Sequence, residues 1–206
     1  MPSTDLTGNV IEPELGRHIL AELGDLNADF IALLLDDNSP FAGKNFSDAQ
    51  AAALGGLSKP AIRRLSGCAF ALFDLELQNH LLWKSLGTSC TSEKVPGDSV
   101  VQTENSDRTR LFILSALMYL RHLAKINHFF AKLSFNAAPS VLRQISDLPL
   151  HQLRQIANQH PTLLTTRFSD YPDAWTDLLQ LAKRNDTEPM LPAKILGYQH
   201  LAQPHS

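Results

Sequence analysis

One stretch, HFFAKLSFNAAPSVLRQISDLPLHQLRQIANQHPTLLTTRF, runs from His128 to Phe168 and contains the main features of the fold. Its opening apolar run ends a long helical pattern. A short Ala/Ser segment, a Leu-Pro-Leu corner and the helical LHQLRQIA follow. The last part, TLLTTRF, is rich in β-branched residues, which favour extended backbone. This order predicts a helical fold with short extended pieces.

A weaker copy of this stretch lies upstream, between Asp29 and Phe73. We interpret the match as two copies of one supersecondary unit. The alternative is that two unrelated helical halves align on their leucines. At one constant offset, Leu54, Leu57, Ile62 and Leu65 correspond to Ile145, Leu148, Leu153 and Ile156.

The fold class that we expect is all-α, with two related helical halves packed as a pseudo-dimer. A polar segment containing Pro96 and Gly97 separates the halves. Short extended segments are expected at 68–73 and 162–168. The expected organisation is a first half at 1–87, a linker at 88–106, a second half at 107–184 and a loosely packed tail at 185–206.

Several helix boundaries follow from local signals. Ser47 and Ser58 are expected N-caps of two short helices. Neither Gly nor Pro occurs between Arg108 and Leu133, which predicts one uninterrupted helix there. The segment 75–86, LELQNHLLWKSL, has the pattern of an amphipathic helix. In the closing helices of the two halves, Trp83 and Trp175 are expected to be core anchors.

The composition is that of a globular protein with a sizeable core, because 44% of the residues are hydrophobic and 19% are charged. Cys68 and Cys90 lack the spacing of a disulfide scaffold or a zinc site, and Cys68 is expected in the core. No apolar run reaches the roughly 18–20 residues of a membrane span. The N-terminus has no signal-peptide pattern. We therefore expect a cytoplasmic protein without membrane contact.

Charge is distributed unevenly along the chain. Residues 1–106 carry 7 Lys/Arg and 14 Asp/Glu, whereas residues 107–206 carry 11 and 7, which gives net charges of −7 and +4. A mildly basic half is suited to nucleic acid or to an acidic partner. The alternative is that it faces the acidic half of its own chain.

Arginines near the two corners are the candidate contacts with DNA or with a protein partner. Arg63 and Arg64 follow the first corner, and Arg143 and Arg154 flank the second. Helix-borne arginines can contact phosphates and fix a helix on a duplex. The alternative for each of them is a solvated surface position.

No catalytic motif is visible. The histidines include no HExxH zinc motif, and the chain has no glycine-rich phosphate loop, so neither a metal nor a cofactor is predicted. His122 and His128 are expected to be partly buried helix residues rather than metal ligands. An enzyme would require a cleft lined by perturbed ionisable groups, which residue spacing does not reveal.

The stretch from Leu114 to Leu181 resembles the FlhD family of flagellar transcriptional activator subunits. That family has a long leading helix, a Leu-Pro corner, a short helix, an extended segment ending in Arg-Phe and a closing helix. Here Ile145–Leu153 supplies the corner, Arg154–Asn158 the helix and Thr166–Phe168 the end of the extended segment. Gly24–Phe30 and Leu54–Pro60 match more faintly in the first half.

FlhD proteins are all-α dimers that join a zinc-bearing partner, FlhC, to bind promoters. The resemblance therefore implies a covalent pseudo-dimer, in which the linker makes a homodimer contact intramolecular. It also implies a non-enzymatic transcriptional regulator that acts through protein–protein contacts with an FlhC-like subunit in a DNA-binding complex. The alternative is a helical adaptor or scaffold that makes no contact with nucleic acid.

Overall fold

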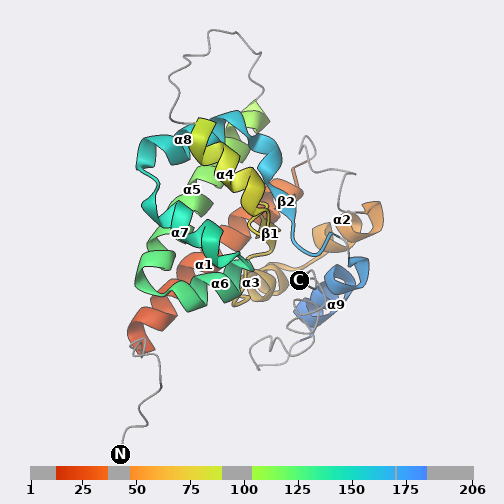
Figure 1. The fold of residues 1–206 in the computed structure, drawn as a ribbon. Helices are drawn as coiled ribbons and strands as arrows, with labels where there is room; N and C mark the ends of the chain where they lie inside the picture. The colour runs from red at the N-terminus through yellow and green to blue at the C-terminus, as the bar shows by residue number, and fades with distance from the viewer. Residues whose placement is uncertain (1–12, 37–46, 90–103, 170, 185–206) are drawn as a thin grey trace, which may run out of the picture.

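The computed structural model describes residues 13–36, 47–89, 104–169 and 171–184 (Figure 1). These residues are mainly helical, which confirms the all-α fold class. The expected linker and the expected tail lie largely outside the described residues. The helices are α1 (Pro13–Leu34), α2 (Asp48–Gly55), α3 (Lys59–Ser66), α4 (His80–Ser89), α5 (Glu104–Ile126), α6 (His128–Phe135), α7 (Pro139–Asp147), α8 (Leu150–Gln159) and α9 (Pro172–Lys183), and the strands are β1 (Phe73–Asp74) and β2 (Thr165–Thr166).

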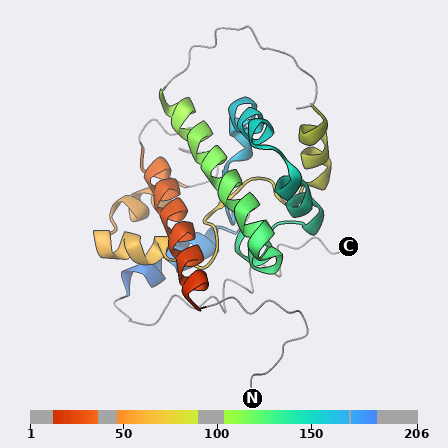
Figure 2. The ribbon, with the colours of Figure 1, turned by 90° about the vertical axis from the view of Figure 1, so that its left-hand side faces the viewer.

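The two long helices, α1 and α5, lie side by side and run in opposite directions (Figure 2). At one end, Nη1 of Arg108 lies 2.9 Å from Oδ2 of Asp36. At the other end, the hydroxyl of Tyr119 donates a hydrogen bond to the carbonyl of Ile19 at 2.7 Å. The start of α5 is therefore level with the end of α1.

The expected N-caps are confirmed. Ser47 begins α2 with a capping box, since its Oγ accepts from the backbone N–H of Gln50 and its own N–H donates to that glutamine side chain. Ser58 begins α3, and its Oγ accepts from the N–H of Ala61 at 3.4 Å. These side chains satisfy backbone donors that have no partner inside the helix.

The single long helix expected between Arg108 and Leu133 is wrong, because the helix breaks at Asn127. The backbone of Asn127 is extended, with φ −149°, and its Oδ1 accepts from the N–H of Phe130 at 2.8 Å. Asparagine competes for backbone donors in this way, and so α6 begins as a new helix. Asn136, in the left-handed conformation at φ 49°, then ends α6.

The helix expected at 75–86 also begins later than its pattern predicts, because α4 starts at His80. The carboxylate of Asp74 accepts hydrogen bonds from the N–H groups of Leu75 at 2.7 Å and Leu77 at 3.4 Å. Glu76 has a positive φ of 55°, which is incompatible with a right-handed helix. A tight turn therefore replaces the first residues of the expected helix.

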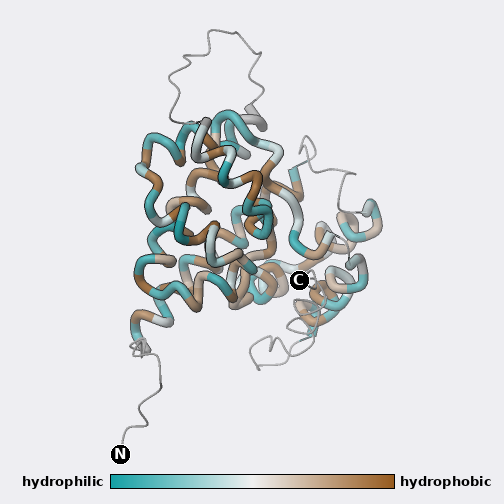
Figure 3. The backbone as a smooth tube through the Cα atoms, viewed as in Figure 1, coloured by the Kyte–Doolittle hydropathy of each residue, from teal (hydrophilic) through white to brown (hydrophobic). Residues whose placement is uncertain are grey.

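The core of the described residues is one continuous cluster with contributions from both parts of the chain. Phe73 lies at its centre, with ring centroids 5.6 Å from Phe30, 4.9 Å from Phe112 and 5.9 Å from Phe135. Hydrophobic and hydrophilic residues alternate along most helices, as expected where one face of each helix is buried (Figure 3). The burial of Trp83, Trp175 and Cys68 confirms their expected place in the core.

Two short strands join the parts of the chain that lie on either side of α5. β1 and β2 are antiparallel, and Phe73 pairs with Thr166 while Asp74 pairs with Thr165. The segment expected to be extended at 162–168 contains β2, and the segment at 68–73 meets β1 at its last residue.

Asn27 connects α1 with the segment between α3 and β1. Its side chain is fully buried, and its amide donates to the carbonyls of Ser66 and Phe70, each at 3.0 Å. Its Oδ1 accepts from the N–H of Leu72 at 2.9 Å. One side chain therefore satisfies three backbone groups that lack helical or strand partners.

Arg167 is a buried cation that follows β2. Its Nη1 donates to the carbonyls of Ala71 at 3.2 Å and Ser134 at 2.6 Å. The guanidinium also lies 5.5 Å from the ring centroid of Phe70 and 5.3 Å from that of Phe168. Burial lowers the pKa of Arg167 to about 10, against the opposing attraction of the nearby carboxylate of Asp74.

Stability is expected to fall above pH 9 because of Cys68. Burial raises the pKa of the Cys68 thiol from 9.0 to about 12, whereas the unfolded chain loses this proton near pH 9. The unfolded state is therefore favoured as the pH rises, by about 1 kcal/mol between pH 8 and pH 10. Urea unfolding at the two pH values measures this loss. The variant Cys68→Ala should lose about 1 kcal/mol less over the same interval, and an equal loss in both proteins contradicts the assignment.

Candidate nucleic-acid or partner interface

Helices α7 and α8 form a helix–corner–helix unit on α5. Pro139 lies in the first turn of α7, where its missing N–H costs nothing. Leu148 leaves the helical conformation at ψ 131°, and Pro149 then starts α8. The inward side chains that fix this unit on the core are Val141, Leu142, Ile145, Leu148, Leu153, Ile156 and Ala157.

The outer face of α8 is polar beyond Leu150 and has no acidic residue. Arg154 is exposed there, one turn from His151 and Asn158. The remaining outward residues of this helix after Leu150 are glutamines. Arg, Asn and Gln are the side chains that contact phosphates and base edges in protein–DNA complexes. The outer face of α8 therefore has the chemistry of a nucleic-acid contact.

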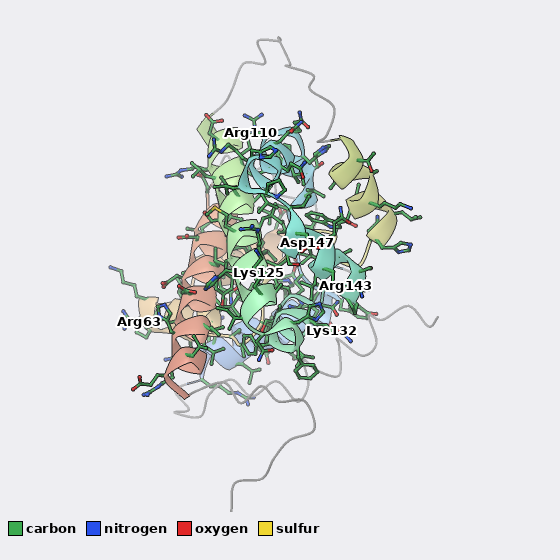
Figure 4. The ribbon with its side chains drawn as sticks, turned by 60° about the vertical axis from the view of Figure 1, so that its left-hand side comes forward. Arg63, Arg110, Lys125, Lys132, Arg143 and Asp147 are labelled. Carbon is green, nitrogen blue, oxygen red and sulfur yellow. The ribbon has the colours of Figure 1, made fainter. Side chains whose placement is uncertain are left out.

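Lys132 and Arg143 extend this basic character to α6 and α7. Both side chains are exposed, as is Lys125 on α5. Figure 4 shows these three residues on one side of the molecule, with Asp147 among them. Between residues 108 and 169 the chain has eight Lys/Arg, and Asp147 is the sole Asp or Glu. Lys132 is not among the candidates named from the two Leu-Pro corners. The lack of acidic residues between 108 and 169 is the sequence signal that would have indicated it.

The structure separates the two arginines of α3. Arg63 is exposed and lies on the far side of α1 from Lys132 and Arg143 (Figure 4). Arg64 is half-buried, and its Nε and Nη2 donate to the carbonyl of Ala182 at 3.0 and 2.8 Å. That carbonyl is in the last turn of α9, where a cation is favourable. Arg64 therefore joins α3 to α9, and its guanidinium is already engaged within the protein.

Replacing Arg64 with alanine is expected to lower the free energy of unfolding by about 2 kcal/mol, because a charged donor leaves a helix-end carbonyl without its partner. Arg63→Ala is the matched control, since it removes the same side chain from the exposed neighbouring position. Its effect should stay within about 0.5 kcal/mol. Thermal unfolding followed by circular dichroism compares the two, and equal destabilisation would contradict a structural role specific to Arg64.

A shallow groove of about 350 Å³ runs between α1 and α5. Its lining combines one acidic and one basic side chain, Asp29 and Arg108, with apolar side chains that include Leu33 and Leu111. Leu111 is 64% exposed. The lining thus offers charge and apolar surface for contact with another helix, and it holds no cluster of groups suited to acid–base chemistry.

His122 and His128 are exposed on α5 and α6, so the expectation that they are partly buried is wrong. Within the described residues, no group of three or more His, Cys, Asp and Glu could hold a metal ion. In the same part of the chain, no helix is long and apolar enough to cross a membrane. Comparison with protein-family models, with curated proteins and with solved structures found no match.

Proposed function

We propose that the chain is a non-enzymatic transcriptional regulator subunit, similar to FlhD, which acts in the cytoplasm as part of a DNA-binding complex. The observation that carries this proposal is that α6, α7 and α8 each expose one basic side chain. Lys132, Arg143 and Arg154 are exposed there, in a stretch with a single acidic residue. Basic residues grouped on one face are the electrostatic footprint of nucleic-acid binding.

We further propose that the chain is an internal duplication, and two matching details support this. The indole N–H of Trp83 donates to the carbonyl of Leu75, eight residues earlier, and that of Trp175 donates to the carbonyl of Arg167, also eight residues earlier. The residue after each acceptor has a positive φ, 55° at Glu76 and 63° at Phe168. Non-glycine residues rarely adopt this conformation, so its recurrence at the same place favours a common origin.

The packing of the closing helices supports a pseudo-dimer. α4 packs on α7, and α9 packs on α2 and α3, so each closing helix contacts the short helices of the other half. Trp83 and Trp175 are 92 positions apart, and the same shift carries Phe73 to Thr165 and Asp74 to Thr166. The β1–β2 pair Phe73–Thr166 therefore corresponds to the pair Thr165–Asp74, so the two pairs change places. This exchange is what a two-fold axis through the ladder requires.

Fluorescence anisotropy with labelled duplex DNA tests the proposal. The triple variant Lys132→Ala, Arg143→Ala, Arg154→Ala should weaken binding to all DNA sequences. The slope of the logarithm of the binding constant against the logarithm of the salt concentration should fall by about one unit for each phosphate that the variant no longer neutralises. Arg17→Ala, at an exposed position of α1, is the control and should leave binding unchanged. The measurement is made with the chain alone and with a candidate zinc-bearing, FlhC-like partner. Binding that is absent in both, or equal in the triple variant, overturns the DNA role.

A helical adaptor without DNA contact is the second candidate. Exposed apolar side chains on α5 and α6 favour it, because Leu111, Met118 and Phe129 are 64%, 45% and 69% exposed. Such residues are typical of surfaces that contact other proteins. A pull-down in which partners are retained after nuclease treatment, together with no binding in the anisotropy series, would favour the adaptor.

A further inference from the structure

The outward face of α5 carries a strip with the spacing of a helix–helix seam. Its members are all exposed and alternate at intervals of four and three residues. This is the a/d spacing through which helices pack on one another. The strip consists of Leu111, Ser115, Met118, His122 and Lys125.

The neighbouring helix α1 is acidic beside this strip. Residues 13–36 contain five Asp/Glu and one Lys/Arg. Asp25 and Asp29 are exposed, and Asp29 lines the groove together with Leu111 of α5. Lys125 and Arg108 are exposed on the α5 side. The two helices therefore present opposite charges on either side of an apolar groove.

We propose that this α1/α5 face binds the same face of a second copy of the chain. The two-fold axis runs along the groove, so that α1 of each copy lies over α5 of the other. An isologous contact of this kind requires a self-complementary surface. The acidic α1 of each copy faces the basic α5 of the other copy, so the charges are complementary at both contacts. Leu111 and Met118 lie between the two pairs of helices.

The level of the residues along the helices supports this axis. Rotation about an axis parallel to the helices keeps each residue at its level. Arg108 is level with Asp36 within one copy, so it also lies at the level of Asp36, two residues after α1, in the second copy. Lys125 lies beyond the level of Ile19 and meets the beginning of that helix, which contains Glu14. An in-plane axis perpendicular to the helices would instead place α1 over α1, with acidic residues facing each other, and is disfavoured.

The oligomeric state of the full chain tests the proposal. Light scattering between about 1 μM and 1 mM should show a concentration-dependent rise toward twice the chain mass of 22.8 kDa. Leu111→Lys should weaken association by about tenfold or more, since it places a charge in the apolar part of the contact. Leu81→Lys is the matched control, because Leu81 is 68% exposed on α4, away from the groove. A chain that is monomeric throughout, or equal loss in both variants, overturns the proposal.

Charge reversal identifies the occupant as a second copy. The variant Asp25→Lys, Asp29→Lys makes both helices basic, and the variant Arg108→Glu, Lys125→Glu makes both acidic. Each variant alone should be monomeric, and an equimolar mixture should restore the dimer, because opposite charges then meet at both α1–α5 contacts. All four positions are at the surface, so the variants should stay folded, as circular dichroism would verify. A mixture that remains monomeric contradicts the contact.

Discussion

Replacing Asn27 with alanine is expected to lower the free energy of unfolding by about 3 kcal/mol or more, because three backbone groups lose their partner at once. These groups are the Ser66 and Phe70 carbonyls and the Leu72 N–H. Ser66 is the last residue of α3, and Phe70 and Leu72 lie in the segment between α3 and β1, which runs through the core without regular pairing. Urea unfolding followed by tryptophan fluorescence measures the decrease.

Asn158→Ala is the matched control for this experiment. Asn158 is an exposed asparagine inside α8, so the same substitution there changes helix propensity and solvation only. Its effect should stay within about 0.5 kcal/mol. The conservative variant Asn27→Asp keeps an acceptor for Leu72 and removes both donors, and it should not restore stability. Equal stability of Asn27→Ala and Asn158→Ala would show that water replaces the buried amide.

The helices that could be predicted from the sequence are those whose signals are local. A serine before a helical run marks the start of α2 and of α3, because the cap bonds to a residue only three positions away. The Leu-Pro corner between α7 and α8 is equally local. Asn127 gives a weaker signal, since an asparagine inside a polar-and-apolar pattern is common in continuous helices. The hydrogen bond from the Phe130 N–H to the Asn127 side chain decides where the helix breaks, and the pattern of apolar residues does not indicate this bond.

The candidate site residues also differ in whether local sequence indicates their role. Arg63, Arg143 and Arg154 are exposed, which is compatible both with the predicted contact role and with the alternative of a solvated surface position. The role of Arg64 depends on Ala182, 118 residues away, and no local pattern indicates that contact. Adjacent arginines therefore look equivalent in the sequence and differ in the fold. The lack of acidic residues between 108 and 169 indicates a basic surface there, although Arg167 within the same stretch is buried.

Replacing Arg167 with methionine is expected to destabilise the fold by about 3 kcal/mol, although the substitution removes a costly buried charge. The carbonyls of Ala71 and Ser134 would lose a donor in a place where little water reaches them. The carboxylate of Asp74 would also lose its nearby cation, and burial already raises the pKa of Asp74. These losses outweigh the gain because methionine fills the space without supplying a donor.

Arg167→Lys separates charge from geometry. Lysine keeps the cation, but its single nitrogen cannot lie against the rings of Phe70 and Phe168 as the planar guanidinium does while reaching both carbonyls. We therefore expect the lysine variant to recover less than half of the stability difference, as measured by urea unfolding at neutral pH. Recovery to the wild-type value would show that charge alone matters. Ala71, Ser134 and Arg167 belong to three segments, so the guanidinium joins α6 to the two strands. These hydrogen bonds offset the cost of burying the cation.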